Sequence, residues 1–279
     1  MLDRYGRVIN YLRISVTDRC NLRCCYCMPE GVQDVGMKNI LTFEEIREIV
    51  RTGVSLGITH IRITGGEPLV RKGCVDLIRG IREIPGVETI TMTTNGVLLG
   101  NYGKQLKEAG VSMYHENIET SEENFPNVCT THSFEDKIHE IKRIQEAGLE
   151  LCTGGIVGMG ETWKDRLSMA FTLAELGIRS IPINILIPVK GTPFGELEPM
   201  TQEDILRTVA ILRYINPKAD VRIAAGRNYF KDGGGELFLS GVNAALTGNL
   251  LTTGGSSMEQ DRNILEEKGY ILKKKPTGK

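Results

Sequence analysis

Four of the seven cysteines of this 279-residue chain lie within eight positions, in the stretch CNLRCCYC at residues 20–27. Three of them, Cys20, Cys24 and Cys27, have the spacing CxxxCxxC. Three thiolates on one short loop can bind three irons of a four-iron, four-sulfur (4Fe–4S) cluster and leave the fourth iron open for another ligand. The spacing alone also allows zinc or unrelated thiols. Structural zinc normally takes four protein ligands, and no second CxxC motif follows in the sequence.

The fourth cysteine of the stretch, Cys25, stands directly after Cys24. Its side chain should point away from a centre that both Cys24 and Cys27 face. We therefore predict that Cys25 is not a ligand.

Composition and charge predict a soluble globular protein. The chain is 41% hydrophobic and 25% charged, and its formal net charge is −1. This balance favours neither nucleic acid nor a membrane surface as a partner, and the run Lys273–Lys275 is interpreted as a solvated tail. The first twenty residues are charged throughout, which predicts a cytoplasmic protein with neither secretory signal nor membrane span. Cysteines in a reducing compartment bind metals or catalyse more often than they pair.

Short β-branched runs alternate with segments of helical period, as in β/α units around a parallel sheet. Helical patterns begin after Thr42, Ser133 and Thr162, which are candidate capping residues. Eight strands are predicted at residues 12–16, 60–64, 89–93, 112–118, 149–157, 180–186, 220–224 and 244–248. Eight such units in about 270 residues predict a single (β/α)8 TIM-type barrel over residues 1–279, with its active site at the carboxyl ends of the strands.

The residues around the cysteines, RISVTDRCNLRCCYCMPEG, resemble the radical S-adenosylmethionine (SAM) superfamily. Within it, residues 1–111 resemble most closely the GTP cyclase of molybdenum cofactor biosynthesis. The resemblance implies a radical SAM barrel in which Cys20, Cys24 and Cys27 hold a catalytic 4Fe–4S cluster. In that superfamily the open iron chelates SAM, and electron transfer to SAM generates a 5′-deoxyadenosyl radical.

Two glycine-containing stretches follow the second and third predicted strands. ITGGEP resembles the superfamily segment that binds the amino group of SAM, which implies cofactor binding by Gly65, Gly66 and Glu67. TTNG resembles a cofactor-contacting loop of the cyclase and implies a contact by Thr94. The alternative interpretations are a plain strand-to-helix turn for the first stretch and a helix-capping turn for the second.

Residues 112–270 resemble biotin synthase, and residues 271–279 form a tail. The motifs that carry this second resemblance are YHENIETS, NVCTTHSFED, CTGGIVGMGET, PINILIPVKGTP, VRIAAGR and NLLTT. The resemblance implies that Asn117 and Glu119 bind SAM and that His115, Asn117, Asn184 and Arg222 contact the substrate. It also implies a cofactor-contacting turn at residues 154–162. Exposed alternation along a strand, a polar strand end and a glycine-rich connection are the alternatives for these positions.

Biotin synthases hold a second iron–sulfur cluster by three cysteines and an arginine, and the resemblance gives only two of these ligands here, Cys152 and Arg222. Our alignment places Ile63 and Met92 at the other two positions, where neither side chain replaces a thiolate. A second cluster is therefore doubtful. Cys74 and Cys129 are alternative ligands, but Cys74 is more simply a buried thiol of the second helix, and Cys129 belongs to the biotin synthase-like motif NVCTTHSFED.

The favoured function is thus a radical SAM enzyme that inserts sulfur into dethiobiotin, as biotin synthase does. The expected partners are a reducing protein such as flavodoxin or ferredoxin and a second copy of the chain in a homodimer. GTP cyclisation is the alternative that residues 1–111 suggest. A third possibility is a barrel that binds and cleaves SAM without completing a reaction, since the second-cluster ligands are incomplete.

Overall fold

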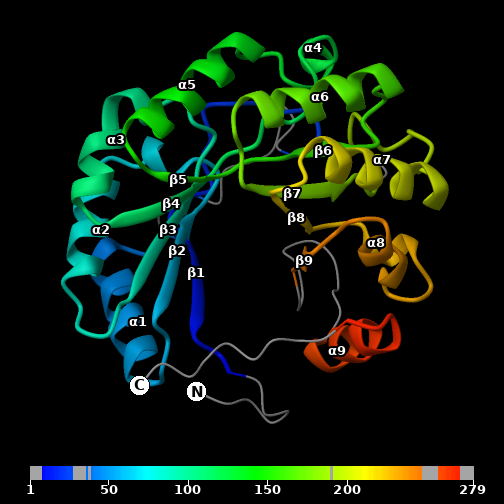
Figure 1. The fold of residues 1–279 in the computed structure, drawn as a ribbon. Helices are drawn as coiled ribbons and strands as arrows, with labels where there is room; N and C mark the ends of the chain where they lie inside the picture. Colours follow the sequence, from blue (N-terminus) through cyan, green and yellow to red (C-terminus); the bar gives the residue numbers. More distant parts are fainter. Residues whose placement is uncertain (1–7, 28–35, 37–38, 189–190, 247–256, 271–279) are drawn as a thin grey trace. The chain divides into compact units, whose positions relative to one another are not determined.

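The computed structural model describes residues 8–27, 36, 39–188, 191–246 and 257–270, and the chain divides into two compact units (Figure 1). The first unit contains Met1–Thr153 with Gly191–Pro193, and the second contains Gly154–Lys190 with Phe194–Lys279. Each unit is described by itself below. The assignment of residues 1–279 to a single domain stays a prediction.

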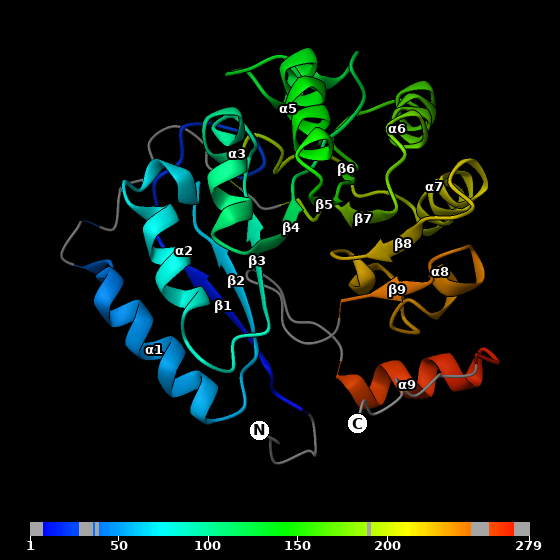
Figure 2. The same cartoon turned by 60° about the vertical axis from the view of Figure 1, so that its left-hand side comes forward.

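The first unit is a parallel sheet with strand order β1-β2-β3-β4-β5. Figures 1 and 2 show helices α1, α2 and α3 along one face of strands β1–β4. The strands are β1 (Tyr11–Ser15), β2 (His60–Thr64), β3 (Thr89–Thr93), β4 (Val111–His115) and β5 (Glu150–Cys152). The helices are α1 (Phe43–Ser55), η2 (Pro68–Val70), α2 (Cys74–Arg82), α3 (Leu99–Glu108), α4 (Phe125–Val128) and α5 (Phe134–Glu146).

Residues that are in register on neighbouring strands point to the same face of this sheet, and side chains alternate faces along each strand. One row contains Ile63, Met92 and Tyr114, which are fully buried among the apolar residues of the helices. The next row contains Thr93, His115 and Cys152, on the opposite face and at the carboxyl ends of their strands. The sheet therefore has one face that packs against helices and one that presents polar side chains.

The second unit has a smaller parallel sheet, in which β7 pairs with β6 and β8, and β8 pairs with β9. Helices α6 and α7 pack against each other, and α7 contacts β8. The strands are β6 (Gly155–Val157), β7 (Ser180–Ile185), β8 (Asp220–Ile223) and β9 (Ala244–Ala245). The helices are α6 (Trp163–Glu175), α7 (Gln202–Ile215), η3 (Arg227–Tyr229), α8 (Gly235–Leu239) and α9 (Met258–Glu267).

The predicted helix starts are confirmed. Thr42, Ser133 and Thr162 each cap a helix, at the start of α1, α5 and α6. In each case the hydroxyl accepts a hydrogen bond from the backbone N–H three residues later, and the acidic side chain there binds the cap backbone in return. These reciprocal bonds satisfy N–H groups that a helix start otherwise leaves without partners.

The strand predictions agree closely with the structure except at three places. The predicted strand 149–157 is two strands, β5 and β6, because the chain breaks at Gly154, where a Cβ atom would lie 1.8 Å from the carbonyl oxygen of Pro182. The predicted strand 112–118 ends already at His115. The last predicted strand, 244–248, is β9 over Ala244–Ala245, and its residues 247 and 248 lie outside the described residues, as do the NLLTT motif and the tail.

Within the described part of the chain, no helix combines the length and the apolar character that crossing a bilayer requires.

Candidate functional site

The cysteine loop begins where β1 ends. The N–H of Val16 donates to the carbonyl of Thr64 (2.8 Å), which continues the pairing with β2 by one residue. Beyond it, Cys20 and Cys24 are partly buried and Cys27 is exposed, and all three are free thiols. The N–H of Cys27 donates to the carbonyl of Cys24 (3.0 Å), so a tight turn joins the last two. The loop thus lies at the carboxyl end of the first strand, as predicted.

The loop offers a donor set that fits a 4Fe–4S cluster held by three cysteines. The Sγ atom of Cys20 accepts hydrogen bonds from the N–H of Leu22 (3.4 Å) and from Nδ2 of Asn95 (3.6 Å). Such N–H···S bonds stabilise thiolates and tune cluster potentials. Among the described residues, no group of three His, Cys, Asp or Glu side chains could hold a single metal ion.

Glu67, in the GGEP segment after β2, is a fully buried carboxylate that joins two loops. It accepts hydrogen bonds from the N–H of Leu69 (2.9 Å), the hydroxyl of Thr94 (2.9 Å) and the N–H of Asn95 (2.7 Å). Burial raises the pKa of Glu67, and these hydrogen bonds oppose that effect. The side chains of Glu67 and Thr94, both predicted to bind cofactor, are therefore bonded to each other.

The two glycines of GGEP lie directly against the chain that leads into the cysteine loop. The N–H of Gly66 donates to the carbonyl of Thr17, and the N–H of Glu67 donates to that of Arg19, both at 2.8 Å. A Cβ atom at Gly66 would lie 2.3 Å from the Arg19 carbonyl oxygen, and one at Gly65 would lie 2.6 Å from that of Thr17. Both positions require glycine because the two backbones approach so closely.

A buried ion pair that the sequence did not reveal supports the TTNG loop. Lys137 of α5 and Glu116, which follows β4, are 3.1 Å apart, with side-chain exposures of 2% and 0%. The ammonium group of Lys137 also donates to the carbonyl of Asn95 (2.7 Å). Burial alone would lower the pKa of Lys137, but the charges of Glu116 and Glu119 raise it. Burial raises the pKa of Glu116 to about 7.

The raised pKa of Glu116 predicts a pH-dependent stability. In the unfolded chain this carboxyl ionises near pH 4.5, whereas in the folded chain it does so near pH 7, so the folded state binds more protons between these values. The free energy of unfolding should therefore fall as pH rises through this window, by about 2 to 3 kcal/mol between pH 5 and 8. The measurement is urea denaturation at both pH values for the parent and Glu116→Gln. Glu116→Gln should lack this part of the pH dependence. If the free energy of unfolding changed equally with pH in the parent and the variant, Glu116 would not be the group responsible.

The segment after β4 carries the predicted SAM and substrate residues. Glu119 is buried and is the one described residue other than glycine with a positive φ, 66°. It accepts hydrogen bonds from the hydroxyl of Tyr26, between Cys24 and Cys27, and from the side chain of Asn117. Burial raises its pKa. Strained backbone at a buried carboxylate is typical of functional sites.

Several buried polar atoms at the carboxyl ends of neighbouring strands have no hydrogen-bond partner among the described residues. They are Thr93 Oγ1 after β3, Asn117 Oδ1 and Glu119 Oε2 after β4, and Thr153 Oγ1 after β5. Such atoms ordinarily bind a polar group, so this edge of the sheet fits a polar ligand. Of the threonines at these strand ends, the sequence predicted a role for Thr94 but none for Thr93 and Thr153. The alternation of faces along β3 was the signal that separates Thr93 from Thr94.

Cys129 lies beside the cysteine loop. Its Sγ atom is 3.8 Å from Sγ of Cys24, and the N–H of Cys25 donates to the carbonyl of Val128 (3.2 Å). The hydrogen bond from Cys129 lowers the pKa of Cys24, and the same bond raises the pKa of Cys129. Cys74, in contrast, is buried in α2, where burial raises its pKa to about 12, as expected of a core thiol.

The positions expected for second-cluster ligands need a correction. Ile63 and Met92 belong to the row that packs against the helices, whereas Cys152 is in register with His115 on the opposite face. Neither side chain therefore points to the face of Cys152, as the strict alternation along β2 (HIRIT) and β3 (TITMT) also indicates. On β2 and β3 the residues that share the face of Cys152 are His60, Arg62, Thr64, Thr89, Thr91 and Thr93. None of them is a thiol, so these strands do not fit a cluster held by three cysteines.

In the second unit, Asn184 and Arg222 lie on one face of the sheet, because Arg222 is in register with Pro182, two residues before Asn184 on β7. Both side chains are half-buried, and Nη2 of Arg222 is 3.5 Å from Oγ of Ser180. In the turn at 154–162, Glu161 accepts hydrogen bonds from the N–H groups of Gly158 and Met159 and pairs with Arg166 at 2.8 Å. This carboxylate fixes the glycine-rich connection.

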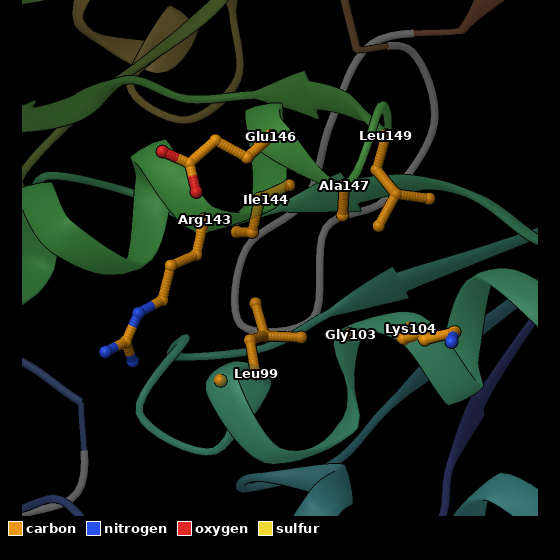
Figure 3. Close-up of a pocket in the computed structure, with 9 residues that line it drawn as sticks. Leu99, Gly103, Lys104, Arg143, Ile144, Glu146, Ala147 and Leu149 are labelled. Atoms are coloured by element: carbon orange, nitrogen blue, oxygen red, sulfur yellow. The ribbon is translucent and has the colours of Figure 1, made fainter.

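A cavity of about 300 Å³ lies between α3 and α5 (Figure 3). Leu99 and Lys104 line it from α3, and Arg143, Ile144 and Glu146 line it from α5. None of the predicted site residues contributes to this cavity. It is therefore separate from the polar strand ends.

Two family models match the chain. The model of the radical SAM superfamily matches residues 14–173, and that of the biotin and thiamin synthesis associated domain matches residues 182–271. The first includes the cysteine loop, the GGEP and TTNG segments, and the segment after β4. The second includes the greater part of β7 and Arg222.

Two relatives are similar over nearly the whole chain. A biotin synthase of Clostridium beijerinckii is 61% identical over 258 residues, which cover 91% of this chain and 82% of the relative. A biotin synthase of Alkaliphilus metalliredigens is 44% identical over 275 residues, covering 96% and 86%. Because residues 112–279 make up well under 91% of the chain, this relatedness extends into the segment with cyclase-like motifs. The resemblance to the cyclase itself stays a prediction.

Among solved structures, methylornithine synthase has a TM-score of 0.73 at 18% identity, over 96% of this chain and 84% of that one. At this identity the likeness shows the fold alone. The predicted fold class, an α/β barrel of the TIM type as in radical SAM proteins, is confirmed.

Proposed function

Because the chain belongs to the biotin synthase family of radical SAM enzymes, we propose that it acts on dethiobiotin, from which a hydrogen atom is abstracted before sulfur is inserted. The observation that carries the proposal is the 61% identity to a biotin synthase over 91% of the chain. The site agrees with it, since a three-cysteine loop and unpaired polar atoms both lie at the carboxyl ends of parallel strands.

The cysteine loop is the part of the site that we assign to the 4Fe–4S cluster, with Cys20, Cys24 and Cys27 as its ligands. The family's cofactors are this cluster and SAM, and when bound the cluster would supply the electron for reductive cleavage of SAM to the 5′-deoxyadenosyl radical. Leu22 and Asn95 donate to Cys20 and hold its sulfur in place. The hydrogen bond from Cys129 favours the thiolate form of Cys24, which is the form that binds iron.

We assign SAM binding to the edge formed by the GGEP segment and the residues after β3 and β4. Glu67 and Thr94 take part by holding the two loops together, since their side chains bind each other. We therefore assign binding of the SAM amino group to the backbone at Gly65 and Gly66. Asn117 and Glu119 have unpaired oxygens that accept hydroxyl hydrogens, as the ribose of SAM offers.

His115, Asn117, Asn184 and Arg222 are the proposed substrate contacts. His115 is in register with Thr93 and Cys152 on the polar face of the first unit, and Asn184 shares a face with Arg222 in the second. An amide and a guanidinium are suited to the urea and carboxylate groups of dethiobiotin. The residues of β2 and β3 do not fit a second cluster, so no step is assigned to one and Cys152 is interpreted as a buried thiol.

The remaining parts of the proposal concern partners. The enzyme needs one-electron reduction, for which a flavodoxin or ferredoxin is the proposed donor, and a homodimer is the proposed assembly. A cytoplasmic location would keep the seven free cysteines reduced.

The proposed function is tested with anaerobically reconstituted protein, SAM, a chemical reductant and added sulfide. Dethiobiotin should bind and should increase 5′-deoxyadenosine formation, and biotin should appear in the mass spectrum. GTP should neither bind nor increase 5′-deoxyadenosine formation. Binding of GTP in place of dethiobiotin would overturn the proposal in favour of the cyclase reaction. Release of 5′-deoxyadenosine that is independent of dethiobiotin, without biotin, would show a barrel that completes no reaction.

A further inference from the structure

Two thiols that are distant in the sequence lie side by side in the first unit. Cys24 and Cys129 are 105 positions apart, yet their sulfur atoms are separated by 3.8 Å. A disulfide bond is about 2 Å long, so each sulfur would have to move by about 1 Å to form one. Rotation of the two side chains supplies movements of that size.

The backbone beside these thiols holds the two segments together. The N–H of Cys25 donates to the carbonyl of Val128, so the residue after one thiol is bonded to the residue before the other. Cys129 itself is fixed at the end of α4, where its N–H donates to the carbonyl of Phe125 (2.9 Å). Phe125 packs edge-on against Phe134, with ring centroids 5.6 Å apart, and so anchors α4 to the start of α5. The approach of the two sulfurs is therefore fixed by the fold.

Cys129 is neither a proposed cluster ligand nor a proposed substrate contact. It is 2% exposed, and a buried thiol without a neighbour would be an ordinary core residue. Its contact is with one of the three proposed cluster ligands, and Cys24 is partly exposed and open to small reagents. This pairing of a reachable thiol with a buried one is the arrangement in which the second thiol resolves a bond made by the first.

We propose that Cys24 and Cys129 form a reversible disulfide in the cluster-free chain and that this bond withholds Cys24 from cluster assembly. The oxidant is a low-molecular-weight disulfide such as oxidised glutathione. The Cys24 thiolate attacks one of its sulfurs and releases one small thiol. Cys129 loses its proton, attacks Sγ of Cys24 and releases the second small thiol. Two protein thiols are oxidised to one disulfide and one small disulfide is reduced to two thiols, so atoms and electrons balance.

The disulfide blocks cluster assembly because it removes one of the three ligands. With Cys24 bound to Cys129, only Cys20 and Cys27 remain in the loop, and two thiolates do not replace the three that the CxxxCxxC loop supplies. Reduction of the disulfide by a dithiol restores Cys24 as the third ligand. Formation of the bond rests on the geometry alone, whereas its effect on cluster assembly rests on the proposed function.

The test uses full-length protein from which the cluster has been removed under reducing conditions. The parent, Cys129→Ser and Cys25→Ser are equilibrated in glutathione buffers of rising oxidation, alkylated and mapped by mass spectrometry without reduction. Cys25→Ser is the matched control, because it removes a thiol adjacent to Cys24. Each sample is then given iron and sulfide, with or without dithiothreitol, and bound iron is measured.

The parent and Cys25→Ser should lose two free thiols per chain and yield one peptide pair joined through Cys24 and Cys129. Both should lose iron uptake until dithiothreitol is added. In Cys129→Ser, Cys24 should end as a mixed disulfide with glutathione. A dominant bond between two cysteines of the loop, or a Cys129 that stays a free thiol while Cys24 is oxidised, would overturn the proposal. Normal iron uptake by the protein with the Cys24–Cys129 disulfide would show that the bond does not block cluster assembly. Failure of even the reduced parent to take up iron would instead count against the proposed function.

Discussion

Replacing Cys20, Cys24 and Cys27 together by alanine is expected to abolish both the 4Fe–4S cluster and the SAM cleavage that depends on it. Iron and sulfide content should fall to background, and 5′-deoxyadenosine formation should fall more than about 10³-fold, because no other group in the site can deliver the electron. The measurements are iron and sulfide analysis, Mössbauer spectroscopy and product quantification. The parent should contain one four-iron cluster.

Cys25→Ala is the matched control for the triple variant. It removes a thiol from the same loop, adjacent to Cys24, and should keep the parent's iron content and activity. Loss of the cluster in this variant would show that the spacing argument chose the wrong cysteines. Iron that survives in the triple variant would show that a second cluster had been dismissed wrongly, with Cys152 and Arg222 as the first candidates for its ligands.

Replacing Lys137 by methionine is expected to lower the free energy of unfolding by about 3–5 kcal/mol, a large fraction of the stability of a typical domain. The substitution keeps the length and the apolar body of the side chain but leaves Glu116 buried without its counter-charge, and it removes the hydrogen bond to the carbonyl of Asn95. The measurement is urea denaturation at pH 8, where Glu116 is ionised.

Lys142→Met is the control on the same helix, since Lys142 is exposed in α5, and it should change the free energy of unfolding by no more than about 0.5 kcal/mol. The double variant Glu116→Gln/Lys137→Met should recover part of the loss, because it removes the unpaired charge as well. If the change in the free energy of unfolding of the double variant equalled the sum of the changes in the two single variants, Glu116 and Lys137 would not be coupled. At pH 5, where Glu116 is protonated, the effect of Lys137→Met should be smaller.

The sequence was sufficient for elements whose determinants are local. Strands β2 and β3 have the predicted bounds, because β-branched residues and flanking turns define them. The starts of α1, α5 and α6 follow from capping residues and their acidic partners three positions later. The position of the cysteine loop after the first strand was likewise predicted, since a motif at the end of a parallel strand lies at the edge where such sites occur.

The contacts that support the site are not local, and the sequence did not predict them. Glu67 was expected to bind the cofactor, but its carboxylate lies inside the protein, on Thr94 and the N–H of Asn95. The partners Glu116 and Lys137 are 21 positions apart, and Cys24 and Cys129 are 105 positions apart. No spacing rule links such residues, because the pairing arises only when β4, α4 and α5 are in place.

The close approach of Gly66 to Arg19 has a consequence for protein engineering. A Cβ atom at Gly66 would lie only 2.3 Å from the carbonyl oxygen of Arg19, so the backbone of the GGEP segment packs directly against the backbone that leads into the cysteine loop. If the cysteine loop were grafted into another barrel without its own GGEP segment, its backbone would not fit against the corresponding glycines of the host. The two segments form a module for transplantation, and a chimera that exchanges radical-generating loops between barrels should keep its cut sites outside residues 14–68.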